Sequence, residues 1–330
     1  MPYLQETTYR SPFYLFNGHL QTIIPAVMRK VNGISYYRER ITTPDEDFLD
    51  LDWAFAENKR KTKPSQLAII SHGLEGDSQR PYVTGMVRML TSEGYDVLAW
   101  NYRSCSGEIN RQRRFYHIGA TDDLHTVVEY VTQMKPEYTE IVLLGFSAGG
   151  NITLKYLGEQ GALLAPFIKK SVVFSVPLDV KTSSAKISKP QNFIYEQRFL
   201  RSLRKKILKK AEIMPQAIDI MPLQTIRKLK EFDDVYTAPL HGFKDAIDYY
   251  TQNSSKFFLQ GIKVPTLIVN AINDPFLSPE CFDQSLVTNL PNVWLQITQA
   301  GGHCGFMYQS LQNTFWSETR ALSFLKESHL

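Results

Sequence analysis

The sequence predicts an α/β fold with a mostly parallel central sheet, helices on both faces of the sheet and one helical insertion. Short continuous apolar runs alternate along the chain with amphipathic helical stretches, which is typical of parallel strands covered on both faces. A long segment with its own composition interrupts this alternation once. With 330 residues, 43% of them hydrophobic, the chain can form one large α/β domain that carries such an insertion.

The expected elements follow the chain in order. Residues 36–44 (YYRERITTP) and 48–57 (FLDLDWAFAE) alternate with a period of two, which predicts an antiparallel hairpin at one edge of the sheet. Six apolar runs then predict buried parallel strands at 67–73, 95–103, 141–147, 171–177, 264–271 and 293–299. Helical patterns, each followed by a glycine or a polar stop, lie between them at 82–94, 121–134 and 151–161.

The segment 180–243 is predicted to be a helical cap or lid. It divides the α/β core into residues 1–179, which include an N-terminal extension, and residues 244–330. Within it, residues 199–215 (FLRSLRKKILKKAEIMP) form a basic helix on which a set of apolar residues follows helical spacing. That set is Phe199, Leu200, Leu203, Ile207 and Leu208.

The charge run on this helix has three interpretations. It consists of Arg198, Arg201, Arg204, Lys205, Lys206, Lys209 and Lys210. The simplest is a solvated helix face. An amphipathic basic helix can also lie on an anionic membrane surface, or it can bind an acidic ligand or partner.

Composition excludes several classes of protein. The net charge of +4 is mild, whereas nucleic-acid-binding proteins concentrate a stronger basic stripe on one face, so no nucleic-acid partner is expected. The three cysteines lack the spacing of a zinc site or a disulfide framework, and no cluster of histidines and carboxylates has ligand spacing. We therefore expect neither a metal nor another cofactor. Neither a signal peptide nor a run of eighteen apolar residues is found, which predicts a soluble, cytoplasmic protein.

The stretch IVLLGFSAGGN (141–151) predicts a nucleophile elbow. It joins a strand to a helix through Gly-x-Ser-x-Gly, and small neighbours are needed where the two backbones approach each other around the serine. Gly145, Gly149 and Gly150 meet that need around Ser147. A phosphate-binding loop would require a lysine after the glycines, and none follows. A tight turn without catalytic function is the remaining alternative.

A serine nucleophile requires a base and an acid later in the chain. His303, in QAGGHCGF after the last strand, is the candidate base. Asp274, in NAINDPFLSP directly after a strand, is the candidate acid, with an Asp-Pro turn as its structural alternative. Asp179, which follows the run SVVFSVP, is the second candidate acid.

Two backbone N–H groups are the candidate oxyanion donors. The loop SHGLEG follows the first core strand and supplies Leu74, and the residue after the nucleophile supplies Ala148. His72 is expected to hold this loop in place.

Together these motifs resemble the YheT-like branch of the α/β-hydrolases. The resemblance runs in order through NGHLQTIIPAVMR, DFLDLDW, SHGLEG, RRFYHIGATDDL, GFSAGGN, TAPLHGFKDAIDYY, NAINDPFLSP and GGHCGF. It implies an α/β-hydrolase fold and a serine esterase or lipase with the triad Ser147, Asp274 and His303, which acts on medium-chain acyl esters or glycerolipids. One departure is Ser104 in NYRSCSGE, where the branch usually has glycine. We expect this change to alter a loop near the pocket without touching the triad.

Two alternatives to hydrolysis remain open. Relatives in this branch include alcohol acyltransferases, and HIGATD also fits the His-x4-Asp pattern of certain acyltransferases through His117 and Asp122. In this context Thr121 or Asp122 is instead expected to cap the following helix. A non-catalytic binding module with the same fold is the third hypothesis, disfavoured because every triad position is filled.

Overall fold

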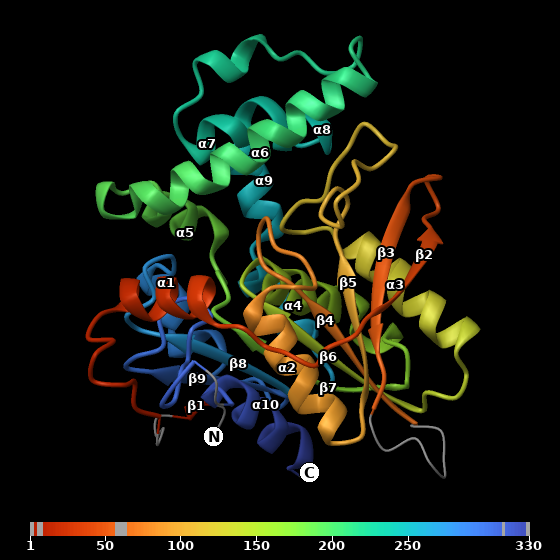
Figure 1. Ribbon diagram of the computed structural model, residues 1–330, viewed down its shortest axis with the longest axis vertical. Helices are drawn as coiled ribbons and strands as arrows, with labels where there is room; N and C mark the ends of the chain where they lie inside the picture. Colours follow the sequence, from red (N-terminus) through yellow and green to blue (C-terminus); the bar gives the residue numbers. More distant parts are fainter. Residues whose placement is uncertain (1–2, 5–8, 57–64, 312–313, 328–330) are drawn as a thin grey trace.

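A nine-stranded sheet runs through the centre of the molecule in the computed structural model, which describes residues 3–4, 9–56, 65–311 and 314–327 (Figure 1). The strand order is β1-β9-β8-β7-β6-β4-β5-β3-β2. The strands are β1 (Tyr3–Leu4), β2 (Tyr37–Thr42), β3 (Phe48–Ala54), β4 (Gln66–Ser71), β5 (Asp96–Asn101), β6 (Glu140–Phe146), β7 (Ile168–Phe174), β8 (Thr266–Ala271) and β9 (Val293–Thr298).

The helices connect these strands and build the cap. The longer ones are α1 (Gly18–Met28), α2 (Pro81–Ser92), α3 (Thr121–Met134), α4 (Ala148–Gln160), α5 (Val180–Ile187), α6 (Phe193–Ile213), α9 (Ala246–Asn253) and α10 (Trp316–Lys326). Short turns of helix are α7 (Leu229–Phe232), α8 (Ala238–Leu240) and the π-turn Asp233–Thr237. The 3-10 turns are Gly161–Leu163, Pro190–Asn192, Met221–Gln224, Ser255–Phe257, Leu259–Gly261, Pro279–Phe282 and Gln284–Leu286.

The mostly parallel sheet and its edge hairpin were predicted correctly. All neighbouring strands pair in parallel except β2 with β3 and β3 with β5. The six apolar runs correspond to β4 to β9, and the helical patterns at 82–94, 121–134 and 151–161 correspond to α2, α3 and α4. The last residue of the run 48–57, Glu57, lies outside the described residues.

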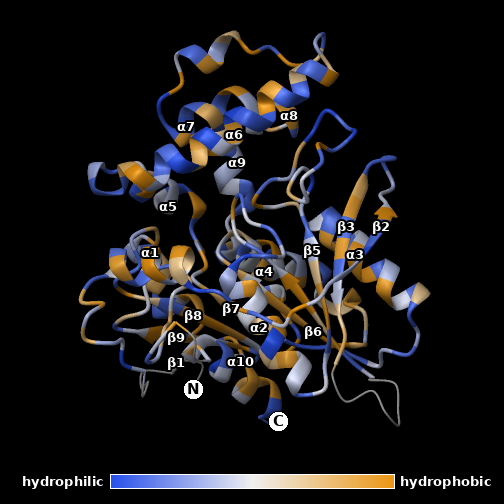
Figure 2. Cartoon of the chain, in the orientation of Figure 1, coloured by the Kyte–Doolittle hydropathy of each residue, from blue (hydrophilic) through white to orange (hydrophobic). Residues whose placement is uncertain are grey.

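Helices cover both faces of the sheet, so the core has two layers. On one face, α3 and α4 pack Val127, Val131 and Ile152 against the strands. On the other, α2 and α10 pack a second apolar cluster that includes Met86 and Phe324. In Figure 2 hydrophobic residues run along the central strands, whereas helices such as α3 alternate between hydrophobic and hydrophilic residues. The core strands are buried on both faces, which explains why their sequences are continuously apolar.

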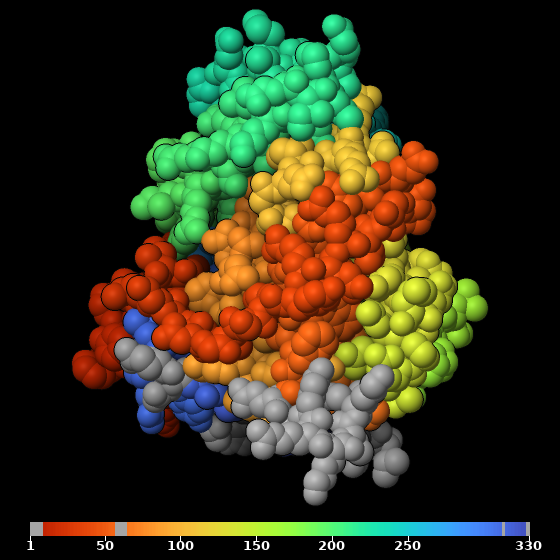
Figure 3. All heavy atoms as spheres, turned by 45° about the vertical axis from the view of Figure 1, so that its right-hand side comes forward, coloured from red at the N-terminus to blue at the C-terminus, as the bar shows by residue number. Residues whose placement is uncertain are grey.

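The segment 180–243 is helical and lies above the carboxyl ends of the parallel strands (Figure 1). It has a small core of its own, in which Leu200 and Ile207 of α6 meet Leu229, Phe232 and Tyr236. In the space-filling view this segment lies above the N-terminal segment, with a recess between the two (Figure 3).

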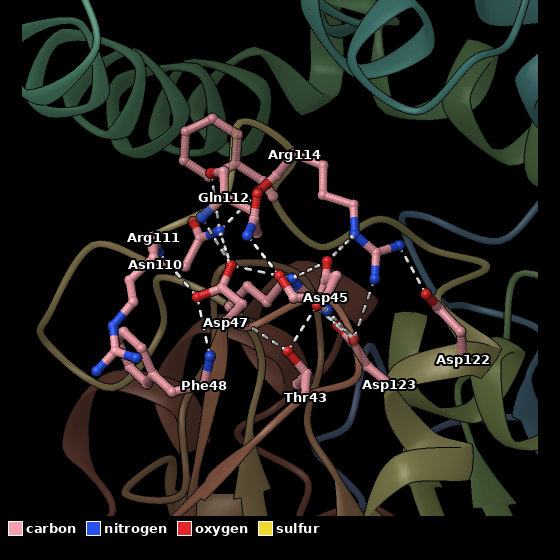
Figure 4. Close-up of polar contacts among 12 residues, drawn as sticks. Thr43, Asp45, Asp47, Phe48, Asn110, Arg111, Gln112, Arg114, Asp122 and Asp123 are labelled. Atoms are coloured by element: carbon pink, nitrogen blue, oxygen red, sulfur yellow. Dashed lines mark hydrogen bonds and ion pairs between the residues drawn. The ribbon is translucent and has the colours of Figure 1, made fainter.

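A buried ionic network ties the hairpin to the loop that follows β5 (Figure 4). The Arg103 side chain is 1% exposed and contacts three carboxylates: Asp45 at 2.9 Å, Asp47 at 2.9 Å and Asp123 at 2.7 Å. Asn110 donates to Asp47 at 2.6 Å. The network shapes residues 103–114, the loop on which the cap rests.

The expected side-chain cap of α3 is not formed. The helix begins at Thr121, and its N-cap residue is Ala120, which makes no side-chain cap hydrogen bond. Asp122 instead pairs with Arg114 at 2.6 Å, and the next residue, Asp123, binds Arg103. Both carboxylates still lie in the first turn, where they interact favourably with the helix dipole.

Candidate active site

The candidate residues follow four strands that end at the same edge of the sheet. Ser147 follows β6, Asp274 follows β8, His303 follows β9 and Leu74 follows β4. Because these strands are parallel, their carboxyl ends meet at one edge, which is where ligands bind in open α/β sheets. The order of the elements therefore brings residues that are far apart in the sequence to one place.

Ser147 sits in a sharp turn between β6 and α4. Its φ is +55° and its ψ is −120°, a conformation that is costly for a residue with a Cβ. The glycines around it are required by close packing. A Cβ on Gly145 would lie 2.6 Å from the carbonyl oxygen of Gly149, and one on Gly149 would lie 2.3 Å from the carbonyl oxygen of Ser71. These are the features of a nucleophile elbow.

His303 and Asp274 are joined directly. The distance from His303 Nδ1 to Asp274 Oδ2 is 2.8 Å, and the two side chains are 12% and 0% exposed. The other carboxylate oxygen, Oδ1, accepts the Phe276 N–H at 2.8 Å. Burial lowers the pKa of His303, but the charge of Asp274 and the neighbouring Cys304 outweigh it and raise the pKa to about 10. The carboxylate thus stabilises the imidazolium form of the ring.

Asp179, the second candidate acid, has other partners. It caps α5 by accepting the Thr182 N–H at 3.1 Å, and it pairs with Lys256 at 2.7 Å. Burial on its own raises the pKa of Asp179, but these contacts outweigh it and lower the pKa. The geometry therefore favours Asp274 as the partner of His303.

His117 and Asp122, the two residues of the His-x4-Asp pattern, contact different partners. His117 lines a cavity beside Ser147, and its ring lies 4.6 Å from that of His241. Asp122 is half exposed and is held by Arg114. In the described part of the chain no hydrogen bond joins His117 to Asp122, so the geometry does not support a catalytic pair.

The loop after β4 carries Leu74 to the same place. In the structure as described, neither the Leu74 N–H nor the Ala148 N–H donates a hydrogen bond to the backbone, so both are available to a ligand. His72 braces this loop as expected. Its Nδ1 contacts the Gly73 carbonyl at 2.8 Å, and its Nε2 accepts the Tyr102 N–H at 3.3 Å. Burial lowers the pKa of His72 to about 3, so its ring is neutral.

Two cavities meet at Ser147 and His303. The first, about 200 Å³, lies between α1 and α6 and also contacts Arg80 and Arg198. The second, about 110 Å³, lies under the cap and is lined largely by apolar side chains, including Ile187 and Leu203. Leu74, Ser147, Phe199, Phe276 and His303 line both cavities. A ligand at Ser147 could therefore extend in two directions.

Helix α1 supports the loop that carries His303, and this contact was not predicted from the sequence. Thr22 Oγ1 accepts the His303 N–H at 2.8 Å, and Gln21 Oε1 accepts the Gly301 N–H at 2.7 Å. A Cβ on Gly302 would lie 2.7 Å from the carbonyl oxygen of Gly18. The motif NGHLQTII contains these residues, but only the three-dimensional structure shows what they contact.

The interpretation of the charge run as a solvated face is wrong for part of α6. Lys210 is fully buried and donates to the carbonyl oxygen of Asn110 at 2.5 Å. Lys206 pairs with Glu75 at 2.7 Å, and Arg204 donates to the carbonyl oxygen of Ile226. The exposed members of the run are Arg198, Arg201, Lys205 and Lys209. Of the apolar set, Leu208 is exposed and the others face the cap core or the cavities.

The departure at Ser104 also has a structural consequence. Its φ is +63°, a conformation that glycine adopts without strain. The Ser104 hydroxyl contacts Asn110 Oδ1 at 2.6 Å and accepts the Asn110 N–H at 3.1 Å. Asn110 in turn binds Lys210 of the cap, so the serine adds a contact to the loop that carries α6.

Comparison with known proteins defines the class. Residues 62–304 match the family model Hydrolase_4, described as "Serine aminopeptidase, S33", and the chain belongs to this family of α/β-hydrolases. The Pyrococcus furiosus esterase Pf2001 shares the fold, with a TM-score of 0.57 and 19% identity over 90% of this chain and 95% of that one. The predicted α/β-hydrolase fold is thereby confirmed.

Two curated relatives narrow the class. The chain is 33% identical over 314 residues to "Putative esterase YheT" of Escherichia coli (strain K12), covering 94% of this chain and 90% of the relative. It is 28% identical over 312 residues to "Phospholipase ABHD3" of Bos taurus, covering 93% and 74%. The resemblance to the YheT-like branch is confirmed, and the chain is a carboxylic ester hydrolase of the esterase and lipase type.

Two further predictions concern membranes and metals. No helix among the described residues is long and apolar enough to cross a bilayer. The same residues contain no group of three or more His, Cys, Asp or Glu side chains placed to hold a metal ion. The cytoplasmic location stays a prediction.

Proposed function

We propose that the protein cleaves carboxylic esters through an acyl-enzyme on Ser147. Ser147 Oγ attacks the ester carbonyl while His303 takes its proton, and His303 then gives the proton to the departing alcohol. Water attacks the acyl-serine with His303 again as base, which releases the acid and restores Ser147. Asp274 holds His303 with Nδ1 protonated, so that Nε2 is free to act as the base.

The developing oxyanion is bound by the backbone N–H groups of Leu74 and Ala148. Among the residues that the structure describes, neither N–H group has a backbone acceptor, and each belongs to a residue that lines a cavity containing Ser147. The Ala148 N–H lies at the N-terminus of α4, whose dipole favours a negative charge there.

The observation that carries the proposal is the meeting of two cavities at Ser147 and His303. We assign the acyl chain to the cavity under the cap, because its walls are mainly apolar. The alcohol portion is assigned to the cavity between α1 and α6, which also presents Arg80 and Arg198. This division suits a medium-chain acyl ester or a glycerolipid, whose two ends differ in polarity. The phospholipase name of one relative agrees with a lipid substrate.

The test is active-site labelling. The purified protein should react with a fluorophosphonate probe and hydrolyse a medium-chain p-nitrophenyl ester, and Ser147→Ala should do neither. Ser92→Ala is the control, because Ser92 is an exposed serine at the end of α2 that lines neither cavity, and its hydroxyl donates to the Met89 carbonyl at 2.8 Å. Equal labelling of the wild type and Ser147→Ala would remove Ser147 from the reaction and leave a binding module as the alternative.

Acyl transfer to an alcohol is the second candidate. The separate cavity between α1 and α6 favours it, since an alcohol could occupy that cavity while the acyl group remains in the other. The same ester should be incubated with and without a medium-chain alcohol, and free acid and new ester measured together. Mainly free acid at modest alcohol concentration supports hydrolysis, and mainly new ester supports transfer.

We further propose that residues 180–243 act as a lid that meets lipid surfaces. Large apolar side chains are exposed on or next to the two helices that line the first cavity: Val27 (64%) on α1, Phe193 (61%) and Ile194 (74%) on α6, and Phe16 (79%) just before α1. The exposed basic residues of α6 continue from Ile194 along the helix, and Arg198 itself lines the first cavity. Exposed apolar and cationic groups on the helices beside one cavity suit an anionic lipid surface.

A further inference from the structure

Glu75 is a buried carboxylate beside the candidate oxyanion donor, and the proposed chemistry does not use it. Its side chain is 5% exposed, and its backbone has a φ of +52°. It follows Leu74 directly in the chain. The position of the Leu74 N–H therefore depends on how Glu75 is held.

Glu75 is held from three sides. Tyr116 donates to Oε1 at 2.8 Å and accepts the Glu75 N–H at 2.8 Å. Arg80 donates to its carbonyl oxygen at 2.7 Å. The remaining contacts come from the cap: Lys206 Nζ lies 2.7 Å from Oε1, and the Ser202 hydroxyl donates to Oε2.

These cap residues belong to α6, and they are positioned for this contact. Ser202 and Lys206 are one turn apart on one face of the helix, so both reach the same carboxylate. Burial lowers the pKa of Lys206, but Cys105 and Glu75 outweigh this effect and raise it, which keeps the side chain cationic. Both partners of this ion pair are largely buried, so removing either one would leave the other charge buried and unpaired at a large cost in free energy.

We propose that Glu75 is a positioning residue through which α6 of the cap holds the oxyanion loop in its catalytic geometry. The proposal rests on the proposed function, since it requires Leu74 to bind the oxyanion. Lys206 acts in two ways: it fixes the carboxylate, and it neutralises a negative charge that would oppose the oxyanion. The cap is then part of the catalytic apparatus as well as a cover.

The experiment compares two buried lysines of the same helix. Lys206→Met removes the cation that binds Glu75, whereas Lys210→Met removes one that binds Asn110 and Gln112. Each variant is assayed for kcat and KM on one medium-chain p-nitrophenyl ester, for inhibition by an alkylboronic acid and for thermal stability. The tetrahedral boronate adduct places an oxygen where the oxyanion forms. The affinity for the boronic acid therefore measures how well the oxyanion donors are positioned.

For Lys206→Met we expect kcat and boronic acid affinity to fall about tenfold with little change in KM, less than the roughly 100- to 1,000-fold loss on removing an oxyanion donor. Lys206→Arg should restore most of both. Lys210→Met should lower thermal stability and leave kcat within about threefold. Ser202→Ala removes the second cap contact without stranding a charge, and it should weaken boronic acid binding about threefold even if Lys206→Met does not fold.

The proposal is overturned if boronic acid affinity is unchanged in Ser202→Ala and in folded Lys206→Met, or if Lys210→Met lowers kcat and affinity as much as Lys206→Met. Failure of the proposed function gives a different result, because the wild type would then not hydrolyse the ester and Ser147→Ala would label like the wild type.

Discussion

Replacing Asp274 with asparagine should abolish most of the activity while preserving the fold. Asp274 Oδ1 accepts the Phe276 N–H, and Oδ2 faces His303 Nδ1. An asparagine keeps its best contacts by placing its carbonyl oxygen toward Phe276 and its amide nitrogen toward the histidine. That nitrogen is a donor, so it favours the His303 tautomer with the proton on Nε2. Such a ring cannot accept the proton of Ser147.

The size of the effect follows from this tautomer. We expect kcat to fall about 10⁴-fold, as for the equivalent change in other serine hydrolases of this triad type. This corresponds to about 5 kcal/mol of transition-state stabilisation. The free energy of unfolding should fall by only about 1 kcal/mol, because the Phe276 contact and one hydrogen bond to the ring are retained.

The pH profile gives an independent readout. Asp274 helps to raise the pKa of His303 to about 10 in the free protein, so the acidic limb of kcat/KM should lie above the ordinary histidine value of 6.5. In Asp274→Asn that contribution is lost while burial still lowers the pKa, so the residual activity should have its limb at lower pH. Initial rates on a p-nitrophenyl ester and the rate of fluorophosphonate labelling, each from pH 5 to 10, measure this.

Asp179→Asn is the matched control. It disrupts the Lys256 pair and weakens the cap of α5, so it should lower stability by about 1 kcal/mol and leave kcat within about threefold. Asp274 does not orient His303 if Asp274→Asn keeps more than about a tenth of the wild-type kcat, or if Asp179→Asn is the more damaging variant.

Three further predictions concern the cavities, the cap and the ionic network. Leu203→Trp should shorten the longest p-nitrophenyl ester that is hydrolysed, whereas Val27→Trp should change the preference for the alcohol portion; the reverse pattern would exchange the two cavities. Glutamine at three exposed basic positions of α6 should reduce sedimentation with anionic vesicles at low salt without changing turnover of a short soluble ester, and a wild type that ignores such vesicles would leave these residues as a solvated face. Those positions are Arg201, Lys205 and Lys209, which do not line either cavity. Arg103→Met should lower the free energy of unfolding in urea by about 3–5 kcal/mol, because it leaves buried carboxylates unpaired. Lys230→Met, which removes an exposed ion pair, should lower it by less than about 1 kcal/mol. Equal losses in the two variants would contradict a structural role for the network.

The sheet could be predicted from the sequence because its signal is local. Continuous apolar runs such as 141–147, alternating with helical patterns, are typical of strands buried on both faces of a covered parallel sheet. The edge hairpin could also be predicted, because polar and apolar residues alternate with a period of two in both of its strands. The positions of the candidate triad followed from the same patterns, since a residue just after a parallel strand must lie at the carboxyl edge.

The contacts between distant polar residues could not be predicted. Nothing local distinguishes Lys206 and Lys210, which face buried acceptors, from Lys205 and Lys209, which face solvent, because all four lie in one basic run. The helical period of 3.6 shows which residues share a face, but not which partner that face meets. The side-chain hydrogen bond expected at the N-terminus of α3 is absent from the described residues for a similar reason, because the Asp122 carboxylate pairs with Arg114 instead. The role of a charge run in a long insertion can therefore be assigned only when the structure shows which residues each charged side chain contacts.

The bracing of the histidine loop by α1 has a consequence for the order of events during folding. Gln21 and Gly301 are 280 positions apart in the chain, and Thr22 and His303 are 281 apart. Contacts of such long sequence separation carry a large loop-closure entropy and form late. Helix α1 is synthesised before strands β2 to β9, whereas its partner loop follows β9. The loop that carries the candidate base is therefore braced only after every core strand has been synthesised and the two segments have met.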